Sequence, residues 1–424
     1  MTANPGPAGP AVSPLAPDRF PDLPPVRGVG LGTHAAGLRY QGRDDVLVVA
    51  LDEGTTVAGV FTRSKCPSAP VDWCRRVVPG GRARALVVNA GNANAFTGGA
   101  GDRAAEATAA ATAAALGCRP GEVLLASTGV IGEILDPDAM TAAVTTTAAG
   151  VEPLADPAAA TDRWRRAAEA IRTTDTFAKG AAATVVGADG AVVMGIAKGS
   201  GMIAPDMATM LAFVFTDLAV TPEALQQATA GSVERSYNRI TVDSDTSTSD
   251  TVLIMATGRA GNEPIAGAGS PGWDELVAAL DAVNLDLAHQ IVRDGEGATR
   301  FVTVTVTGAA DDASAKVIAL AIANSPLVKT ALAAGDANWG RIVMAVGKAG
   351  EPADRDRLTI RIGPELVARH GQLTDGYSEA RATTHLQGAE VTLEVDVGVG
   401  SGTATVWTCD LTHGYIEINA GYRS

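Results

Sequence analysis

The sequence predicts a mixed α/β fold. Along most of the 424 residues, short runs of β-branched and apolar residues alternate with longer Ala-rich segments that have helical periodicity. These segments do not keep the strict strand–helix alternation of one parallel sheet, and they form two halves of similar size. Because 46% of the residues are hydrophobic, the chain can build one large α/β unit, or two to four domains of about 100–200 residues each.

The first half contains predicted strands and helices of ordinary length. Residues 1–26 include eight of the 22 prolines, which excludes a helix or an inner strand, so we expect a flexible tail there. Strands are predicted at residues 45–51, 85–89 and 123–126, and a hairpin at 184–195 around a turn at 187–190. Helices are predicted at residues 103–116, where Gly117 would end the helix, and at 161–171.

The second half begins with a nearly continuous apolar run at residues 210–216, which is typical of a fully buried strand. Thr221 and Pro222 suit the N-cap and first position of a helix that runs toward Tyr237. Further helices are predicted at residues 273–292, 316–323 and 327–333. The remaining predicted strands lie at residues 301–307, 358–362, 390–397, 403–409 and 415–419.

Composition argues against several classes of partner. Lys and Arg number 33 against 47 for Asp and Glu, and no basic tract is present, so we expect no nucleic-acid partner. The four cysteines form no Cys-x-x-Cys pair and the five histidines lack helical ligand spacing, so no metal site is expected. Lys198, Pro205 and Asp206 interrupt the most apolar stretch, and no secretory signal is visible. We therefore expect a cytoplasmic protein without a membrane segment.

A glycine-rich loop at residues 198–211, KGSGMIAPDMATML, is the most unusual segment. A phosphate-binding loop is not favoured, because Lys198 precedes the glycines and a strand follows them. Thr209 lies where this loop meets the buried strand, and glycine and proline allow such a loop to hold a strained backbone. The Thr209 hydroxyl could attack the Ala208 carbonyl, and hydrolysis of the ester would free an α-amine to act as its base. The alternative is an ordinary β-branched residue at the start of a strand.

Motifs spread along the chain resemble those of the ornithine acetyltransferase family, whose members are bifunctional glutamate N-acetyltransferases that cleave themselves before a threonine. The resemblance runs from about residue 27 to residue 424. Besides the loop around Thr209, the motifs are NAGNANA at 89–95, STGVIG at 127–132, TTDT at 173–176, TVDSDTST at 241–248, RDGEG at 293–297, NSPLVKT at 324–330, GDANWGR at 335–341 and NAGYRS at 419–424.

The resemblance implies a role for each matching residue. Thr209 would be the nucleophile and the new N-terminus after cleavage between Ala208 and Thr209. Thr128 and Gly129 would form an oxyanion hole through a hydroxyl and a backbone N–H. The residues that would hold the amino-acid substrate are Thr173, Lys198, Thr209, Glu296, Asn419 and Ser424. A lysine suits a carboxylate and a glutamate suits an ammonium group, so the residue types agree with these roles.

The same resemblance implies an α/β structure with sheets layered between helices, of the self-processing acetyltransferase and aminopeptidase type. Cleavage would leave a first fragment, formed by the tail at 1–26 and residues 27–208, and a second fragment at 209–424, and the two would assemble as a heterotetramer. The implied activity is ping-pong acetyl transfer from N²-acetylornithine to glutamate, in arginine biosynthesis, through an acetyl-threonine enzyme. No dissociable cofactor is implied, although some members also use acetyl-CoA as a donor substrate.

Other functions remain open from the sequence. An N-terminal-threonine amidase or aminopeptidase would use the same nucleophile but give the acyl group to water. An acetyltransferase of specialised metabolism would combine the same scaffold with another acceptor. A non-enzymatic binding protein would leave the chain uncleaved, which a denaturing gel would show as one full-length band.

Overall fold

The computed structural model describes residues 11–421 except residues 155, 189 and 205–209. The described chain divides into two compact units. The larger unit contains residues 18–173 and 178–291, and the smaller unit contains residues 11–17, 174–177 and 292–421. Both units combine β-sheets with helices that pack on them, so the predicted α/β fold with sheets layered against helices is confirmed.

The larger unit contains two five-stranded sheets. The first has the order β5-β4-β2-β1-β6, with β1 at Val29–His34, β2 at Val46–Leu51, β4 at Ala85–Asn92, β5 at Val123–Val130 and β6 at Glu152–Pro153. The second has the order β3-β10-β9-β8-β7, with β3 at Thr56–Phe61, β7 at Lys179–Thr184, β8 at Val192–Lys198, β9 at Leu211–Thr216 and β10 at Thr251–Ala256. The pairs β4–β5 and β9–β10 are parallel, and the other pairs are antiparallel.

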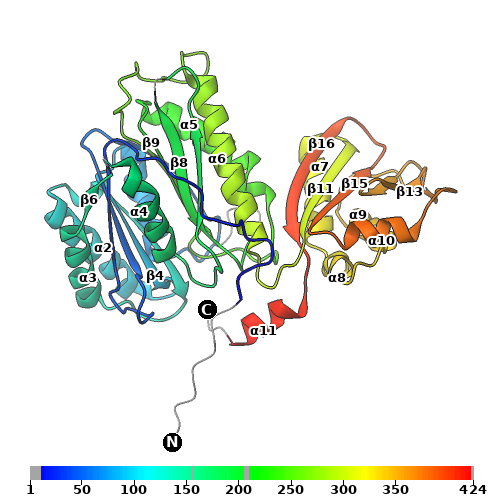
Figure 1. Ribbon diagram of the computed structural model, residues 1–424, viewed down its shortest axis with the longest axis horizontal. Coiled ribbons are helices and arrows are strands. Elements are labelled where there is room, and N and C mark those ends of the chain that lie inside the picture. Colours follow the sequence, from blue (N-terminus) through cyan, green and yellow to red (C-terminus); the bar gives the residue numbers. More distant parts are fainter. Residues whose placement is uncertain (1–10, 155, 189, 205–209, 422–424) are drawn as a thin grey trace, which may run out of the picture. The chain divides into compact units, whose positions relative to one another are not determined.

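Helices cover both sheets of the larger unit (Figure 1). They are α1 at Ala69–Val77, α2 at Gly98–Leu116, α3 at Pro137–Ala149, α4 at Pro157–Ala170, α5 at Pro222–Arg235 and α6 at Trp273–Arg293, which belongs to this unit up to Ile291. Helices α2 and α3 pack on the first sheet, and α5 packs on β3 and β10 of the second. Both sheets contribute to one apolar core, in which Trp164 of α4 lies 5.1 Å from Phe215 of β9 between ring centroids.

The smaller unit contains one six-stranded sheet with the order β14-β13-β12-β15-β11-β16. Its strands are β11 at Phe301–Ala309, β12 at Thr359–Ile362, β13 at Glu365–Arg369, β14 at Gln372–Leu373, β15 at Glu390–Asp396 and β16 at Gly402–Cys409. Its helices are α7 at Asp312–Ala323, α8 at Pro326–Ala334, α9 at Trp339–Gly347, α10 at Glu379–Leu386 and α11 at His413–Gly421. Along β15, exposed and buried residues alternate, because one face packs on the core and the other meets water.

Local signals in the sequence explain several element boundaries. Thr221 caps α5 as predicted, since its Oγ1 accepts a hydrogen bond from the Ala224 N–H at 3.3 Å. Gly117 ends α2 in the left-handed conformation, with φ of 66°. The predicted strand at 210–216 is β9, and all six of its residues are buried.

The predicted strand at residues 415–419 is wrong, because this segment belongs to helix α11. Its alternating Tyr, Glu, Ile and Asn residues have strand periodicity, but none of the described strands pairs with it. Thr412 instead starts a helical turn, since its Oγ1 accepts from the Gly414 N–H at 3.1 Å and its carbonyl from the Tyr415 N–H at 3.3 Å.

The proline-rich N-terminal segment packs on the molecule over its described part. Leu23 and Val26 are buried in the core of the larger unit. In the smaller unit, Ser13 donates from Oγ to the Arg293 carbonyl at 2.6 Å and from its N–H to Thr176 Oγ1 at 2.9 Å. These contacts correct the expectation of a flexible tail for residues 11–26.

No single described helix is both long and apolar enough to cross a membrane. Helices α7 and α8, which are bent by 57°, reach that length and hydropathy only when taken together.

Candidate functional site

The predicted cleavage loop connects two neighbouring central strands of the larger unit. Lys198 ends β8 and lies opposite Leu211, which begins β9 in the antiparallel ladder. The loop therefore leaves and re-enters the sheet at adjacent positions. Ala208 and Thr209, and the predicted substrate residue Ser424, lie outside the described residues.

Lys198 and Thr173, two of the predicted substrate residues, are brought together. Lys198 is only 2% exposed at the end of β8, and its Nζ donates to Thr173 Oγ1 at 3.1 Å. A lysine is almost never buried to this extent unless polar or charged groups surround it. This pair therefore presents an ammonium group and a hydroxyl at one place, which suits an anionic oxygen of a ligand.

Thr128 and Gly129 lie at the carboxyl end of β5, next to β4. The parallel register places Ala90 opposite Thr128 and Gly91 opposite Gly129. Beyond these pairs, the Ala93 N–H donates to the Val130 carbonyl at 2.9 Å. The Asn-rich loop and the predicted oxyanion loop are thus neighbouring strand ends, where α/β sheets commonly bind ligands.

The approach of these two strand ends requires glycine. Gly129 has φ of 126°, and a Cβ atom built on it would lie 2.3 Å from the Gly91 carbonyl carbon. Gly91 has φ of 111°, and a Cβ there would lie 2.4 Å from Arg39 Cβ. At both positions a side chain would be strained by the positive φ and would clash with neighbouring atoms. The direction of the Gly129 N–H therefore depends on glycine at both positions.

Glu296 and Asn419, the other two described substrate residues, meet in the smaller unit. Asn419 donates from Nδ2 to Glu296 Oε2 at 2.6 Å, and to the Tyr415 carbonyl at 2.9 Å. Glu296 is 7% exposed between Gly295 and Gly297. A glutamate side chain oriented in this way by a neutral donor suits an ammonium group.

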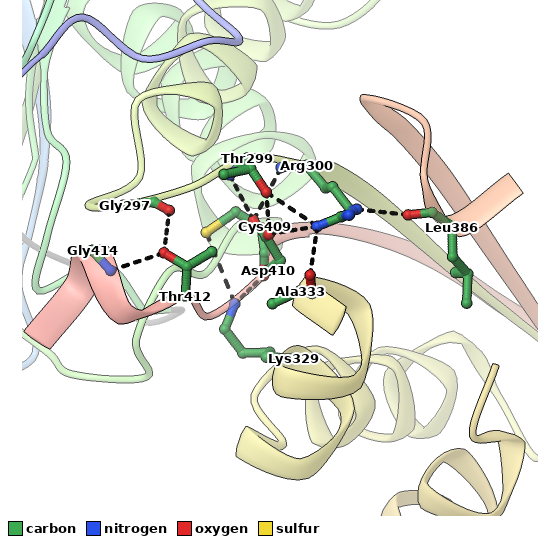
Figure 2. A network of polar contacts seen from close by, with 10 residues as sticks. All are labelled: Gly297, Thr299, Arg300, Lys329, Ala333, Leu386, Cys409, Asp410, Thr412 and Gly414. Atoms are coloured by element: carbon green, nitrogen blue, oxygen red, sulfur yellow. Dashed lines mark hydrogen bonds and ion pairs between the residues drawn. The ribbon is translucent and has the colours of Figure 1, made fainter. Parts of the chain in front are cut away.

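A polar network fixes the segment that leads from β16 into α11 (Figure 2). Asp410, 2% exposed, accepts from Thr299 N–H at 2.8 Å and from Thr299 Oγ1 at 2.6 Å. The same carboxylate accepts from Arg300 N–H at 3.0 Å and from its guanidinium at 3.2 Å. The Arg300 guanidinium also reaches the carbonyls of Leu386 and Ala333, so one charge pair joins three parts of the smaller unit.

The same network reaches the loop that carries Glu296. Lys329 is 3% exposed on α8, and its Nζ donates to Thr408 Oγ1 at 2.8 Å and to the Cys409 carbonyl. Beyond Asp410, Thr412 donates from Oγ1 to the Gly297 carbonyl at 2.6 Å (Figure 2). This hydrogen bond therefore joins Gly297, which follows Glu296, to the turn that precedes α11, the helix that contains Asn419.

Three aspartates that the sequence analysis did not assign to the site lie in or beside its motifs. Asp294, next to the loop of Glu296, accepts three hydrogen bonds from Thr176, including one from Oγ1 at 2.5 Å. Asp243 accepts from the N–H groups of Met202 and Ile203, and burial raises its pKa. Asp250 is fully buried beside Met210. The signal in the sequence was their position: Asp243 lies inside the motif at 241–248, Asp250 lies two residues after it, and Asp294 lies inside the motif at 293–297.

The described His, Cys, Asp and Glu side chains include no group of three or more arranged to hold a metal ion.

The four cysteines are free thiols, with Cys74 and Cys409 buried. Burial raises the pKa of the Cys74 thiol to about 12, so this thiol is neutral and unreactive.

The ArgJ family model matches residues 30–424 of the chain. The chain is 56% identical to the arginine biosynthesis bifunctional protein ArgJ of Rhizobium meliloti, over 98% of this chain and 99% of that protein. Its counterpart in Agrobacterium fabrum is 54% identical with the same coverage. A crystal structure of ArgJ from Bacillus halodurans is 44% identical over 50% of this chain and 98% of that chain, with a TM-score of 0.48. On the family match and the full-length identities, the chain belongs to the ArgJ family.

Proposed function

We propose that the chain cleaves its own peptide bond between Ala208 and Thr209 and then transfers acetyl groups from N²-acetylornithine to glutamate, in arginine biosynthesis. The observation that carries this proposal is the Lys198–Thr173 pair, because it joins two separate family motifs in a buried contact suited to a substrate carboxylate. The full-length similarity to proteins named arginine biosynthesis bifunctional protein ArgJ supports the same function.

Self-cleavage begins when the hydroxyl oxygen of Thr209 attacks the carbonyl carbon of Ala208. The bond from that carbon to the Thr209 nitrogen breaks, the nitrogen takes up the hydroxyl proton, and an ester links the two residues. Water then hydrolyses the ester, which leaves a carboxylate on Ala208 and a free amine and hydroxyl on Thr209. Support comes from the anchoring of the loop at Lys198 and Leu211 and from Met202, whose φ of 57° is strained for a non-glycine residue.

Acetyl transfer uses the same hydroxyl. The α-amine of Thr209 accepts its proton while the oxygen attacks the acetyl carbonyl of N²-acetylornithine. The Gly129 N–H and the Thr128 hydroxyl stabilise the oxyanion, and each such donor lowers the barrier by about 3 kcal/mol. Ornithine leaves with a proton, glutamate enters, and its amine takes the acetyl group from the threonine ester. This double displacement is a ping-pong mechanism.

The substrate-binding residues divide by charge. Lys198 and Thr173 bind the α-carboxylate, and Glu296, oriented by Asn419, binds an ammonium group. Ser424 contributes at the C-terminus of the chain. No dissociable cofactor takes part, because Thr209 itself carries the acetyl group.

Further parts of the proposal concern the donor, the assembly and the location. Acetyl-CoA serves as a second acetyl donor, which would make N-acetylglutamate without N²-acetylornithine. The two self-cleaved fragments assemble as a heterotetramer in the cytoplasm. Native mass spectrometry tests the assembly, since it would show two copies of each fragment.

Parallel assays of acetyl transfer to glutamate, one from N²-acetylornithine and one from acetyl-CoA, test the activity. We expect N-acetylglutamate and ornithine from the first donor, and parallel lines in double-reciprocal plots at several glutamate concentrations. Release of acetate at the same rate with and without glutamate would contradict the transferase and would indicate a hydrolase. Thr209→Ala should abolish both cleavage and transfer.

A further inference from the structure

The loop that joins β1 to β2, residues 35–44, is a part of the larger unit that the proposed function does not use. Its two ends meet, because the Asp45 N–H donates to the His34 carbonyl at 3.0 Å. The Asp45 carboxylate is fully buried and accepts from the N–H groups of Ala36 at 2.7 Å and Leu38 at 2.9 Å. Two backbone donors on one buried carboxylate fix the first half of this loop.

The same aspartate attaches the loop to the strand end beside the predicted oxyanion hole. The Asp45 carbonyl accepts from the Ala90 N–H, in β4, at 2.9 Å. The loop also contacts the next residue of β4, since a Cβ built on Gly91 would lie 2.4 Å from Arg39 Cβ and 3.3 Å from Tyr40 Cε2. The loop is therefore packed on the end of β4.

Farther along, the loop reaches the segment that carries Thr173. Arg43 donates from its guanidinium to the Arg172 carbonyl at 2.5 Å. The guanidinium carbon of Arg43 lies 3.7 Å from the centroid of the Tyr40 ring, and this cation–π contact supports the arginine side chain. The loop therefore connects the residue packed on Gly91 to the residue that precedes Thr173.

The hydrogen bond from Arg43 fixes the backbone from which the Thr173 side chain projects. Helix α4 ends with Ile171 as its C-cap, so residues 172 and 173 lie in neither a helix nor a strand. A peptide group is planar, and the plane that contains the Arg172 carbonyl also contains the nitrogen and Cα of Thr173. Holding the carbonyl oxygen therefore sets the direction of the backbone that presents the Thr173 hydroxyl to Lys198 Nζ, at 3.1 Å.

We propose that Arg43 is a positioning residue for Thr173 in the recognition of the substrate α-carboxylate, with the Tyr40 ring as its support. This inference rests on the proposed function, and it assigns roles to two residues that lie outside the matching motifs. Arg43 acts through the Arg172 carbonyl and keeps the Thr173 hydroxyl beside Lys198. Because N²-acetylornithine and glutamate both carry an α-carboxylate and occupy the same place in turn, loss of Arg43 weakens the binding of both.

The test is a double-mutant cycle of Arg43→Ala and Thr173→Val, with kcat and KM measured for both substrates. We expect Arg43→Ala to raise KM for N²-acetylornithine and for glutamate by the same factor, at least about threefold, with kcat unchanged. Since Arg43 acts through Thr173, the double variant should have the same KM values as Thr173→Val alone, within about twofold.

A merely structural role would give effects that do not depend on Thr173, so the two single effects would multiply in the double variant. Tyr40→Phe keeps the ring beside the guanidinium and should behave like the wild type, whereas Tyr40→Ala should raise KM as Arg43→Ala does. Thermal unfolding of each variant shows whether it is folded, and Tyr40→Ala replaces Arg43→Ala in the cycle if the latter is not.

Arg165→Ala is the matched control. Arg165 is an exposed arginine of α4, and it pairs with Asp162 of the same helix at 2.9 Å. Its removal takes away the same charge as Arg43→Ala without touching the 35–44 loop or the Arg172 carbonyl. This variant should keep the wild-type kcat and KM.

Two results would overturn the inference. Unchanged KM values for both substrates in Arg43→Ala would show that the contact with the Arg172 carbonyl does not serve binding. A KM raised by the product of the two single factors in the double variant would refute an action through Thr173. Failure of the wild-type protein to transfer acetyl groups from N²-acetylornithine to glutamate would instead refute the proposed function, so the two failures are distinguishable.

Discussion

Gly129 lies so close to Gly91 that a single added Cβ atom would reach within 2.3 Å of the Gly91 carbonyl carbon. The contact joins the ends of β4 and β5, where the predicted oxyanion hole is located. Its consequence is that the direction of one backbone N–H depends on the absence of two side chains. Replacing Gly129 with alanine, which adds a single methyl group, therefore tests whether the position of the Gly129 N–H matters.

Gly129→Ala should lower kcat by at least about 100-fold, because misplacing one oxyanion donor removes about 3 kcal/mol of transition-state stabilisation. Steady-state transfer kinetics measure this effect. Gly121→Ala is the control, since a Cβ at Gly121, just before β5, meets no atom within 4 Å. Equal kinetics for the two variants would contradict the oxyanion assignment.

Thr173→Val should raise KM for N²-acetylornithine and leave the fold intact, because Lys198 loses its 3.1 Å hydroxyl contact at the proposed site of the substrate carboxylate. Lys198→Met should have the larger effect, about 10–100-fold in kcat/KM, as expected for a charge-assisted hydrogen bond of ~1.5–3 kcal/mol. Thr173→Ser keeps the hydroxyl and should behave like the wild type. If serine and valine have the same effect, the hydroxyl plays no part.

Glu296→Gln should weaken binding of substrates that carry an ammonium group, since the carboxylate that Asn419 holds at 2.6 Å would lose its charge. A rise in KM for N²-acetylornithine of about tenfold is expected. Thr412→Val, which removes the 2.6 Å bond to the Gly297 carbonyl, should have a smaller effect in the same direction. A lower kcat with unchanged KM in Glu296→Gln would assign this residue to a step other than binding.

Glu365 provides a pH test of the fold of the smaller unit. Hydrogen bonds from the Arg381 guanidinium at 2.7 and 3.0 Å, and from the Ser378 N–H, hold its pKa below the usual range. A depressed carboxyl pKa stabilises the folded state above the unfolded pKa of about 4.3, and the stabilisation is lost as pH falls through the folded value. Arg381→Met should therefore lower Tm at neutral pH, and the deficit should shrink below about pH 4.

Thermal unfolding across this pH range measures the effect of Arg381→Met. Arg355→Met is the control, because the Arg355 side chain is 92% exposed and pairs with its neighbour Asp356 at 3.5 Å. A deficit in Tm that stays constant with pH would contradict the electrostatic explanation.

The elements that the sequence predicted correctly are those with strong local signals. The apolar run of β9 and the cap at Thr221 depend on neighbouring residues only, and both are confirmed. Strands β1 and β3 were missed, because each contains glycine and threonine and lacks a continuous apolar run. Helix α11 was mistaken for a strand because periodicity alone does not show whether a neighbouring strand is present.

Some features of the candidate site could likewise be predicted from the sequence, and others could not. Family motifs identified Lys198, Thr173, Glu296 and Asn419, and the structure shows that these residues form two hydrogen-bonded pairs. The contact of Asp250 with Met210 was not predicted, because the two residues are 40 positions apart in the chain. Contacts of this kind form only when β9 and β10 pair, so no local sequence pattern predicts them.

Mass spectrometry of the purified protein after incubation with N²-acetylornithine alone tests the central claim most directly. The account predicts two fragments, 1–208 and 209–424, with one acetyl group on the N-terminal threonine of the second fragment. Added glutamate should remove this acetyl group and appear as N-acetylglutamate. An uncleaved chain, or a second fragment that never carries the acetyl group while transfer proceeds, would contradict the account.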